Sequence, residues 1–482
     1  MNKTLVGVLA AALLLVGNPV PGRGEVPIAR RVGLDLGARL DVARALTAES
    51  PRALPAEAPT AKDWWGVHFN LAGSGWSSAL EVVSLNLGVW SISHYVLRDP
   101  WSYINEETIR QNLRTGLAWD HDGLLMNTLC HPAHGSMYYN MARASGLSFW
   151  ESAPFALLGS GMWEAIMEVE APSPNDLFFT TCGGIYLGEL SYRLSSRILD
   201  GRARGLERVG RELLSFFLNP ARGVHRLVRG DMFRYQPAGT EAARPSETWF
   251  VIGLTGEGGD PFVNLTFRSG NPFDGAADLG AFDYFVHRSR VRFRNGFCFT
   301  QSGYGYLGGT RLGRTDAPNH VLGFFLNYDL RNAEGVRLAA TSLTGGWVAK
   351  CQLGTVGRLE TTLQFGATLM GGFDNPYYRK GVITPRDYNF GSGAIAKAEA
   401  ALDMGKWGAL RANFAEHYLV VLDGTPGTDR ASFLEASYEI PVYKAWTIGV
   451  EVVDVQRDSN YRNIPDITAS YCNYRLIAGL RF

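Results

Sequence analysis

The stretch that decides the fold is YCNYRLIAGLRF, residues 471–482. Its even-numbered residues are apolar or aromatic, whereas Asn473, Arg475 and Arg481 stand between them. Successive side chains of a β-strand point to opposite faces, so this period of two predicts a strand with one apolar and one polar face. The final residue of that strand would be Phe482.

The same alternation recurs through the chain from Glu247 onward. About twelve such segments can be counted, and an even number suits a closed antiparallel barrel. The segments carry apolar residues at every second position: Val263, Leu265 and Phe267; Leu322, Phe324, Leu326 and Tyr328; Leu359, Leu363, Phe365, Ala367 and Leu369; Leu434, Ala436, Tyr438 and Ile440; Trp446, Ile448, Val450 and Val452. The ending on Phe482 resembles the last strand of bacterial outer-membrane β-barrels.

A soluble β-sandwich is the alternative, because its strands alternate in the same way. The barrel is favoured by outward residues as large as Trp446, Tyr438 and Tyr474, which fit an aromatic girdle at a membrane surface. A membrane barrel also suits a chain with 12% aromatic residues, 56 glycines and 19% charged residues.

The N-terminus indicates export. Lys3 precedes an apolar run from Leu5 to Val16, followed by small and turn-forming residues, which is the layout of a secretory signal peptide. An uncleaved membrane anchor is the alternative reading of this run. Residues 23–63 are rich in Ala, Pro, Arg and Glu and are predicted to form a linker.

Charge limits the partners and the barrel interior. Lys+Arg and Asp+Glu are equal at 46 each, so there is no basic field and no nucleic-acid partner is expected. The polar faces of the predicted strands carry both signs of charge, which predicts a lumen filled by paired side chains and not an open pore. These residues are Glu360, Gln364, Lys397, Glu399, Arg411, Glu435, Glu439, Glu451 and Arg475.

Residues 64–235 have helical periodicity. Ser148 with Glu151 predicts a capping box at the start of a helix that runs to about Val169. Ser173 with Asp176 predicts a second box before a helix that runs to about Asp200. A further helix is expected to start at Pro132 and to close at Gly146.

Polar residues recur at helical spacing and are predicted to form a buried hydrogen-bonded network that could line a groove for a lipid-like or small ligand. The predicted network is Asn127, His131, His134, Tyr139, Arg143, Ser160, Glu164, Glu168, Ser173, Asp176, Thr180 and Glu189. Glu164 and Glu168 lie four residues apart and would repel, so they need partners. His131, Arg143 and Arg193 are the candidate partners. The spacing of Gly184 and Gly188 would let a neighbouring backbone approach closely.

A stretch within this region resembles a known family. WDHDGLLMNTLCHPAHGSMYYNMARASGLSFWESAPFALLGSGMWEAIMEVEAPSPNDLFFTTCGGIYLGELSYRLS is similar to the exported bacterial DUF3943 domain, over roughly residues 64–200. The segment GTRLGRTDAPNHVLGFFLNYD resembles the longer members of that family. The resemblance implies an exported location and this architecture, but no reaction.

Three chemical alternatives compete with a structural network. Metal binding by His131, His134, Glu164 and Glu168 is chemically feasible, but the spacing lacks the H-E-x-x-H pattern, so neither a metal nor a cofactor is expected. A hydrolase using Ser160 or Ser173 with His131 lacks a nucleophile-elbow pattern. A lipid-directed hydrolase of the phospholipase or lipid A deacylase kind could use barrel residues: His287, Ser302, Asp316, His320 and His417. Catalytic residues are therefore left unassigned.

The five cysteines leave one question open. An oxidising compartment would permit a disulfide between Cys130 and Cys182, whereas Cys472 on the predicted lipid face should be free.

The sequence thus predicts an α+β membrane protein with an N-terminal helical bundle domain followed by an antiparallel transmembrane β-barrel. The predicted parts are a signal peptide over residues 1–22, a linker over 23–63, a helical DUF3943-like domain over 64–235 and an outer-membrane barrel over 236–482. The helical domain is expected to be periplasmic or partly inside the barrel. Expected partners are outer-membrane lipid, the barrel insertion machinery and a lipid-like or small-molecule ligand. A noncatalytic envelope role is favoured, and the lipid-directed hydrolase is the alternative.

Overall fold

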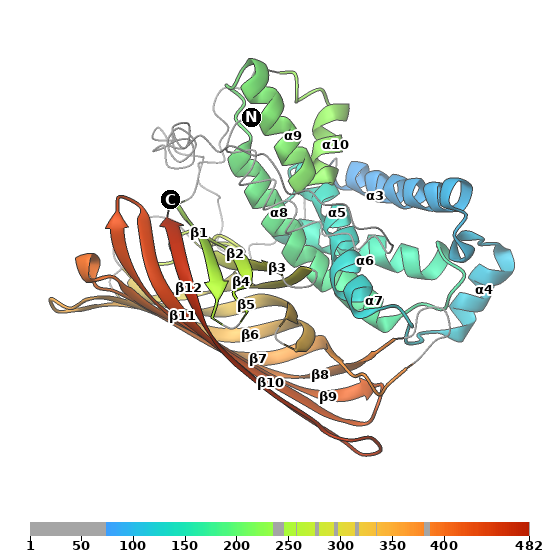
Figure 1. Cartoon of the computed structure of the whole chain (residues 1–482). Helices are drawn as coiled ribbons and strands as arrows, with labels where there is room; N and C mark the ends of the chain where they lie inside the picture. Colours follow the sequence, from blue (N-terminus) through green and yellow to red (C-terminus); the bar gives the residue numbers. More distant parts are fainter. Residues whose placement is uncertain are drawn as a thin grey trace.

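The computed structural model describes residues 74–234, 245–256, 258–274, 279–293, 297–313, 318–333, 335–379 and 386–481. The predicted signal peptide, the predicted linker, Asp316 and the terminal Phe482 lie outside the described residues. Figure 1 shows a barrel with a group of helices packed beside it.

The helices lie between residues 74 and 228. No described helix combines the length and the apolar character needed to span a membrane. The α-helices are α3 (Ser74–Ser91), α4 (Glu106–Thr115), α5 (His131–Ala144), α6 (Phe149–Ile166), α7 (Pro174–Phe178), α8 (Gly184–Ile198), α9 (Gly205–Leu218) and α10 (Pro220–Val228). Short π-helical and 3-10 segments are η2 (Ile92–Leu97), η3 (Pro100–Ser102), η4 (Met126–Cys130), η5 (Phe179–Gly183) and, in the barrel, η6 (Gly405–Trp407).

Two of the three predicted helix starts are present, those at Ser148 and Ser173, and the second differs in its hydrogen bonds. The start predicted at Pro132 is wrong, because η4 continues into α5 without a break and the helical run begins before Pro132. Ser148 and Glu151 form a reciprocal capping box at the start of α6. Ser173 caps α7 through its side chain, which accepts from the Asp176 N–H, but Asp176 does not return a bond to the Ser173 N–H. Glu164 of α6 accepts that bond instead, at 2.8 Å. A tertiary contact therefore replaces half of the predicted local box.

The α5 and α8 helices cross at glycines, as the sequence predicted for Gly184 and Gly188. A Cβ on Gly184 would meet the backbone of Gly135 at 2.6 Å, and a Cβ on Gly188 would meet the ring of Tyr139 at 2.6 Å. The lack of a side chain at these positions lets the two helices approach closely.

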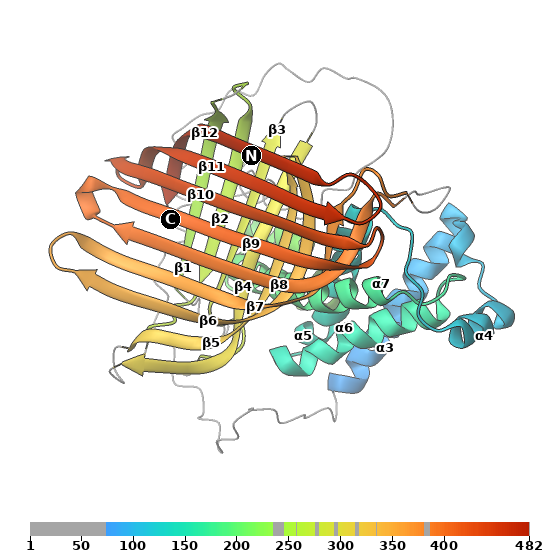
Figure 2. The same cartoon turned by 90° about the horizontal axis from the view of Figure 1, so that it is seen from below.

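Twelve strands among the described residues form one closed antiparallel barrel, which confirms the predicted fold class and excludes the sandwich. Figure 2 shows the long strands of the C-terminal half. The first and last strands close the barrel, with Trp249 opposite Arg481 and Thr255 opposite Arg475. The strands are β1 (Ser246–Thr255), β2 (Pro261–Ser269), β3 (Phe285–Phe293), β4 (Phe297–Gly313), β5 (Pro318–Ala333), β6 (Val336–Leu353), β7 (Gly357–Asp374), β8 (Tyr388–Asp403), β9 (Ala409–Asp423), β10 (Gly427–Tyr443), β11 (Trp446–Tyr461) and β12 (Ile467–Arg481).

The two faces of β12 are those predicted from its alternation. Tyr474 and Leu476 are 69% and 67% exposed on the outer face, whereas Asn473 and Arg475 are buried inside the barrel. Cys472 is free and exposed, as predicted. Cys130 and Cys182 are also free, so the disulfide that the sequence left open does not form.

The barrel lumen is crossed by ion pairs, as the mixed charges predicted. Arg290 of β3 binds Glu435 of β10 and Glu451 of β11, each at 2.9 Å, and Arg475 binds Glu451 at 3.0 Å. The cavity beside Arg290 and Glu435 has a volume of only ≈ 40 Å³. It has room for no more than about three water molecules, so this part of the lumen is closely packed. Two further pairs join Arg288 to Glu399 and Lys397 to Asp329.

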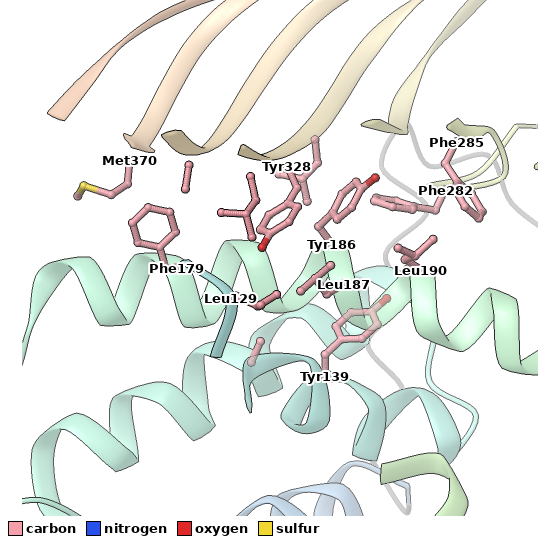
Figure 3. Packing of buried hydrophobic residues seen from close by; sticks show 14 of the residues in the cluster. Leu129, Tyr139, Phe179, Tyr186, Leu187, Leu190, Phe282, Phe285, Tyr328 and Met370 are labelled. Atoms are coloured by element: carbon pink, nitrogen blue, oxygen red, sulfur yellow. The ribbon is translucent and has the colours of Figure 1, made fainter. Parts of the chain in front are cut away.

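The helical domain packs against the outer wall of the barrel (Figure 3). Tyr328 of β5 points outward because its neighbours Asn327 and Asp329 bond to lumen side chains. Its ring stacks on Tyr186 of α8, with centroids 5.5 Å apart, and its hydroxyl donates to the Thr128 carbonyl at 2.6 Å. The predicted location of the helical domain, periplasmic or partly inside the barrel, stays a prediction.

Candidate functional site

The first cluster of polar residues surrounds His131, the first residue of α5. The π-helical segment η4 precedes it. Pro132, the second residue of α5, suits a helical position whose N–H has no partner in the helix. His131 Nε2 lies 3.7 Å from Asp176 Oδ1 and 4.0 Å from Asp122 Oδ2. This histidine thus stands between two carboxylates from different segments.

A second layer of hydrogen bonds fixes the position of Asp120. Its Oδ1 accepts from Asn127 Nδ2 at 3.0 Å and from Asn175 Nδ2 at 2.7 Å. Asn175 also donates to Asp176 at 2.8 Å and accepts from the Ser173 hydroxyl at 2.7 Å. One amide therefore links two acidic side chains to the cap of α7.

The barrel completes this cluster from the far end of the sequence. The Tyr388 hydroxyl of β8 bonds to Asn127 Nδ2 at 2.5 Å, and Arg386 Nη1 donates to the Asp120 carbonyl at 3.1 Å. Arg386 is fully buried and is paired with Asp423. The cluster therefore lies where the helical domain meets the barrel.

Burial and mutual repulsion give the acidic groups unusual protonation. Burial, with Asp176 and Asp122 nearby, raises the pKa of Asp120 to about 7. Burial and Asp176 likewise raise the pKa of Glu164 to about 8. Burial and Glu164 raise the pKa of Glu168 well above its usual value. These carboxyl groups therefore hold protons near neutral pH.

His131 shows the opposite balance. Burial alone would lower its pKa, but the charge of Asp176, a hydrogen bond with Asp122 and the charge of Glu164 together outweigh burial and raise the pKa to about 10. His131 is therefore a cation at neutral pH and offsets part of the negative charge. The described residues contain no group of three or more His, Cys, Asp or Glu arranged to hold a metal ion.

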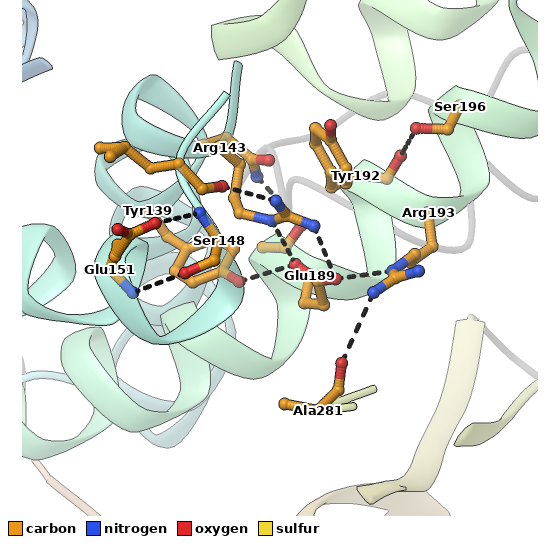
Figure 4. A network of polar contacts seen from close by, with 12 residues as sticks. Tyr139, Arg143, Ser148, Glu151, Glu189, Tyr192, Arg193, Ser196 and Ala281 are labelled. Carbon is orange, nitrogen blue, oxygen red and sulfur yellow. Dashed lines mark hydrogen bonds and ion pairs between the residues drawn. The ribbon is translucent and has the colours of Figure 1, made fainter. Parts of the chain in front are cut away.

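A second cluster is centred on Glu189 of α8, which is fully buried (Figure 4). Its carboxylate accepts from Arg143 Nε at 2.8 Å, from Arg193 Nε at 2.6 Å and from the Tyr139 hydroxyl at 2.6 Å. Burial alone would raise the pKa of Glu189, but the two arginines lower it to about 2. This cluster holds α5 to α8 and reaches the barrel through a bond of Arg193 to Asp283 at 3.3 Å.

The predicted network is therefore divided into two clusters, and one part of the expected pairing is wrong. Arg143 and Arg193 pair with Glu189 and do not reach Glu164 or Glu168. Only His131 among the candidate partners interacts with those two glutamates. The error arises because helical spacing predicts which residues share a face but not which neighbouring helix that face meets.

Three predicted residues belong to neither cluster. His134 packs its ring against Tyr138 and Trp163, and burial, with His131 nearby, lowers its pKa to about 3. The buried Ser160 hydroxyl has no hydrogen-bond partner among the described residues. Thr180 contributes close packing, because its carbonyl oxygen would lie 1.8 Å from a Cβ on Gly135.

The sequence analysis did not predict five members of the His131 cluster: Asp120, Asp122, Asn175, Arg386 and Tyr388. The first three had a signal, since they lie within the acidic motifs WDHDG and SPND. Arg386 and Tyr388 had none, because they come from the barrel, more than 200 positions further along the chain.

The histidines that could serve a barrel hydrolase differ in their surroundings. His320 accepts from Trp347 Nε1 at 3.2 Å on the outer surface. His417 is buried 4.0 Å from Asp329. Only His287 among these three has a serine partner in the described residues, with its Nε2 3.0 Å from Ser289 Oγ. Ser302, predicted as a candidate, donates to the lumen carboxylate Asp329 at 2.6 Å.

The raised pKa values predict that the helical domain loses stability as pH rises between about 5 and 8. The folded pKa of Glu164 is about 8 and its ordinary value is 4.5, so the unfolded chain releases a proton that the folded chain retains. Asp120 acts in the same direction up to about pH 7, and His131 does so between about pH 6.5 and pH 10. His134 offsets part of this loss below about pH 6.5, because its folded pKa is about 3 and the unfolded chain therefore binds the additional proton there. Glu189 adds no slope here, because its stabilising effect is complete above 4.5 and is lost only as pH falls toward 2.

Thermal unfolding of the helical signal at a series of pH values checks this prediction. We expect the melting temperature to fall from pH 5 to pH 8 by several degrees. Glu164→Gln should flatten the slope, because glutamine cannot titrate. A melting temperature that rises with pH over this interval would contradict the protonation pattern.

The fold and these two clusters define a class: an outer-membrane-type β-barrel protein with a helical domain on the barrel wall. Residues 116–221 match the family described as "Domain of unknown function (DUF3943)". The resemblance seen in the sequence is thereby confirmed, although the match starts later and ends later than residues 64–200. The matched residues include both polar clusters, apart from the residues that the barrel contributes to them.

Solved structures similar to the chain have very low sequence identity. OmpT, an outer membrane protein of Vibrio cholerae in its trimer form, is 7% identical with a TM-score of 0.18, covering 49% of this chain and 98% of that one. The outer membrane channel DcaP of Acinetobacter baumannii is 9% identical with a TM-score of 0.19, covering 49% and 95%. No curated protein matches this chain.

Proposed function

We propose that the protein has a noncatalytic role in the outer membrane and binds an amine-bearing ligand, such as a phospholipid with an ethanolamine headgroup, at the His131 cluster. The observation that carries the proposal is the excess of acid there. Asp120, Glu164, Glu168 and Asp176 lie around one imidazole, and burial raises the pKa of all four carboxyl groups, to about 7 for Asp120 and about 8 for Glu164. A bound ammonium group would replace the protons that Asp120 and Glu164 hold near neutral pH.

The edge of the cluster is exposed to solvent, and the cluster has spare hydrogen-bonding capacity. The Asp122 side chain is 44% exposed and that of His131 is 19% exposed, so the cluster reaches solvent. Asn127 Oδ1 is buried and has no hydrogen-bond partner among the described residues. Buried polar atoms are normally bonded, and an ammonium group supplies several N–H donors.

The test uses the purified full chain in detergent and two short-chain lipids, phosphatidylethanolamine and phosphatidylglycerol, followed by calorimetry at pH 7. We expect the ethanolamine lipid to bind and to release protons, detected by comparing buffers of different ionisation enthalpy. Release follows because Asp120 and Glu164 are partly protonated at this pH.

The double substitution Asp120→Asn with Glu164→Gln should weaken binding of the ethanolamine lipid by at least about tenfold, since neutral amides keep the shape of the carboxyl groups but not their charge. Glu212→Gln is the matched control, because Glu212 is an acid of the same domain that pairs with Arg226 outside the cluster. Equal affinity for both lipids, or binding without proton release, would refute the proposal.

A second candidate, a lipid-directed hydrolase, is favoured by the contact of Ser289 with His287. With the imidazole proton on Nδ1, Ser289 Oγ–H can donate to Nε2 at 3.0 Å while Nδ1–H donates to the Tyr186 hydroxyl at 3.2 Å. This is the arrangement of a nucleophile, a base and an orienting group. Arg288 lies between His287 and Ser289, and Arg290 follows Ser289; both arginines bind glutamates in the lumen. Because side chains alternate along a strand, His287 and Ser289 point to the outer side of the barrel.

The chemistry would be acyl transfer from a lipid ester. Ser289 Oγ would attack the carbonyl carbon while His287 takes the hydroxyl proton, and the alcohol would leave with that proton. Water would then hydrolyse the acyl serine with the same base. His287 and Ser289 are both buried beneath the helical domain, so the reaction requires that α8 moves away from the wall.

Fatty-acid release from phospholipid vesicles and labelling by a fluorophosphonate test this candidate. Ser289→Ala should abolish both signals, while Ser302→Ala, a lumen serine, should leave them unchanged. Hydrolysis that persists in the Ser289→Ala variant, or the absence of labelling at Ser289, would refute the hydrolase candidate.

A further inference from the structure

The helices α9 and α10 carry a continuous row of exposed apolar side chains. On α9 these are Leu206, Val209, Leu213 and Phe217, spaced by three, four and four residues and therefore on one face. Leu206 is 90% exposed and the other three are more than half exposed. The adjoining apolar residues of α10 are Val224, Leu227 and Val228, of which Val228 is 80% exposed.

This row is separate from the face that joins α9 to the domain. The packed side of α9 is formed by Leu214, Ser215 and Leu218, all buried. An Arg226 to Glu212 ion pair at 2.7 Å ties α10 to α9. The two helices therefore already have their packing partners, and the exposed row is a second, outward surface.

The segment from residue 200 to 234 is also basic. It contains the arginines Arg202, Arg204, Arg208, Arg211, Arg222, Arg226, Arg229 and Arg234, against the acids Asp200, Glu207, Glu212 and Asp231. Eight positive minus four negative charges gives +4, whereas the whole chain has a formal net charge of zero. The excess lies outside α9, whose two arginines are matched by Glu207 and Glu212, whereas α10 carries Arg222 and Arg226 and no acid. A basic amphipathic helix such as α10 is the signature of a segment that lies on an anionic membrane surface.

The chain connection is long enough for this surface to reach the bilayer. Val228 ends α10 and Ser246 begins β1, so 17 residues join them and can span at most about 60 Å. Further along β1, Ile252 and Leu254 are 45% and 51% exposed and belong to the outward apolar face of the barrel. A connection of this length allows α9 and α10 to reach the lipid headgroups around a barrel in a membrane.

We propose that α9 and α10 dock on the bilayer that the barrel crosses, with the apolar row inserted at the boundary between headgroups and acyl chains. The preferred lipid is an anionic phospholipid, because the segment carries a charge of +4. This docking would fix the orientation of the helical domain relative to the membrane. It is independent of the ligand proposed for the His131 cluster, which lies on other elements.

The experiment places an environment-sensitive NBD fluorophore at Leu213→Cys in a full-length variant whose five native cysteines are replaced. The matched control is Glu207→Cys, which is on the same helix, 59% exposed at its side chain and outside the row. Both proteins are reconstituted in vesicles with brominated acyl chains, with or without phosphatidylglycerol.

We expect quenching at position 213 to exceed quenching at 207 by at least about twofold, to increase with phosphatidylglycerol and to decrease with added salt. Equal and weak quenching at both positions would overturn the proposal. Quenching that is absent while two copies cross-link through position 213 would also overturn it, because the row would then be an interface between chains. Heat-modifiable migration on a gel shows that each variant retains its barrel.

Discussion

Replacing Glu189 by leucine is expected to destabilise the helical domain by about 3 to 5 kcal/mol, the usual cost of removing one partner from a buried ion pair. Glu189 is fully buried and is the shared acceptor for Arg143, Arg193 and Tyr139. Leucine would leave two partly buried guanidinium groups without their main acceptor. The unfolding of the helical signal with denaturant measures this loss.

The control for Glu189 is an ion pair of the same type at the surface. Glu106 and Arg110 of α4 lie 2.5 Å apart, but their side chains are 86% and 52% exposed. Glu106→Leu should therefore change the stability by no more than a few tenths of a kcal/mol. Similar losses of stability for both variants would show that burial does not determine how much the Glu189 cluster contributes to the free energy of unfolding. The barrel has its own closed hydrogen bonding and should remain heat-modifiable in both.

Replacing Gly135 by alanine is expected to cost about 1 to 3 kcal/mol or more, because the added methyl group overpacks a helix crossing. Its Cβ would lie 1.8 Å from the Thr180 carbonyl oxygen and 2.7 Å from the carbonyl carbon. Backbone atoms cannot move aside as a flexible side chain can, so α5 and η5 would have to separate. The same unfolding measurement detects the effect.

Gly161→Ala is the matched control for Gly135→Ala. Gly161 also lies inside a helix, α6, but no atom lies within 4 Å of the Cβ that alanine would add. That substitution should be neutral or stabilising by up to about 1 kcal/mol, the difference in helix propensity. If both alanine variants were equally stable, close approach at Gly135 would not hold the helices together.

Much of the fold was predictable because it depends on local patterns. The alternation around Tyr474 and Leu476 places them on the outer face, and the structure has them there. The capping box of Ser148 and Glu151 was predictable for the same reason, since all its atoms lie within four residues. A pattern of this kind reports the environment of each residue along its own element.

The composition of the candidate sites was less predictable. The sequence placed His131, Glu164 and Asp176 in one network, and the structure brings these three together. It could not assign Arg143 to Glu189, because helical spacing is equally compatible with pairing Arg143 to Glu164 or Glu168. The contact of Asn127 with Tyr388 had no local signal at all.

The sequence by itself thus determined the strand faces, two of the helix starts, the glycines at the helix crossing and the balance of charge inside the barrel. The tertiary structure alone decided that the helices cover the outer wall, where they bury His287 and Ser289 on a face that would otherwise meet lipid. It also decided which arginine meets which glutamate. The physical reason is that periodicity specifies the side of an element on which a residue lies, whereas ion pairing and pKa depend on distances between elements that only the packed chain defines.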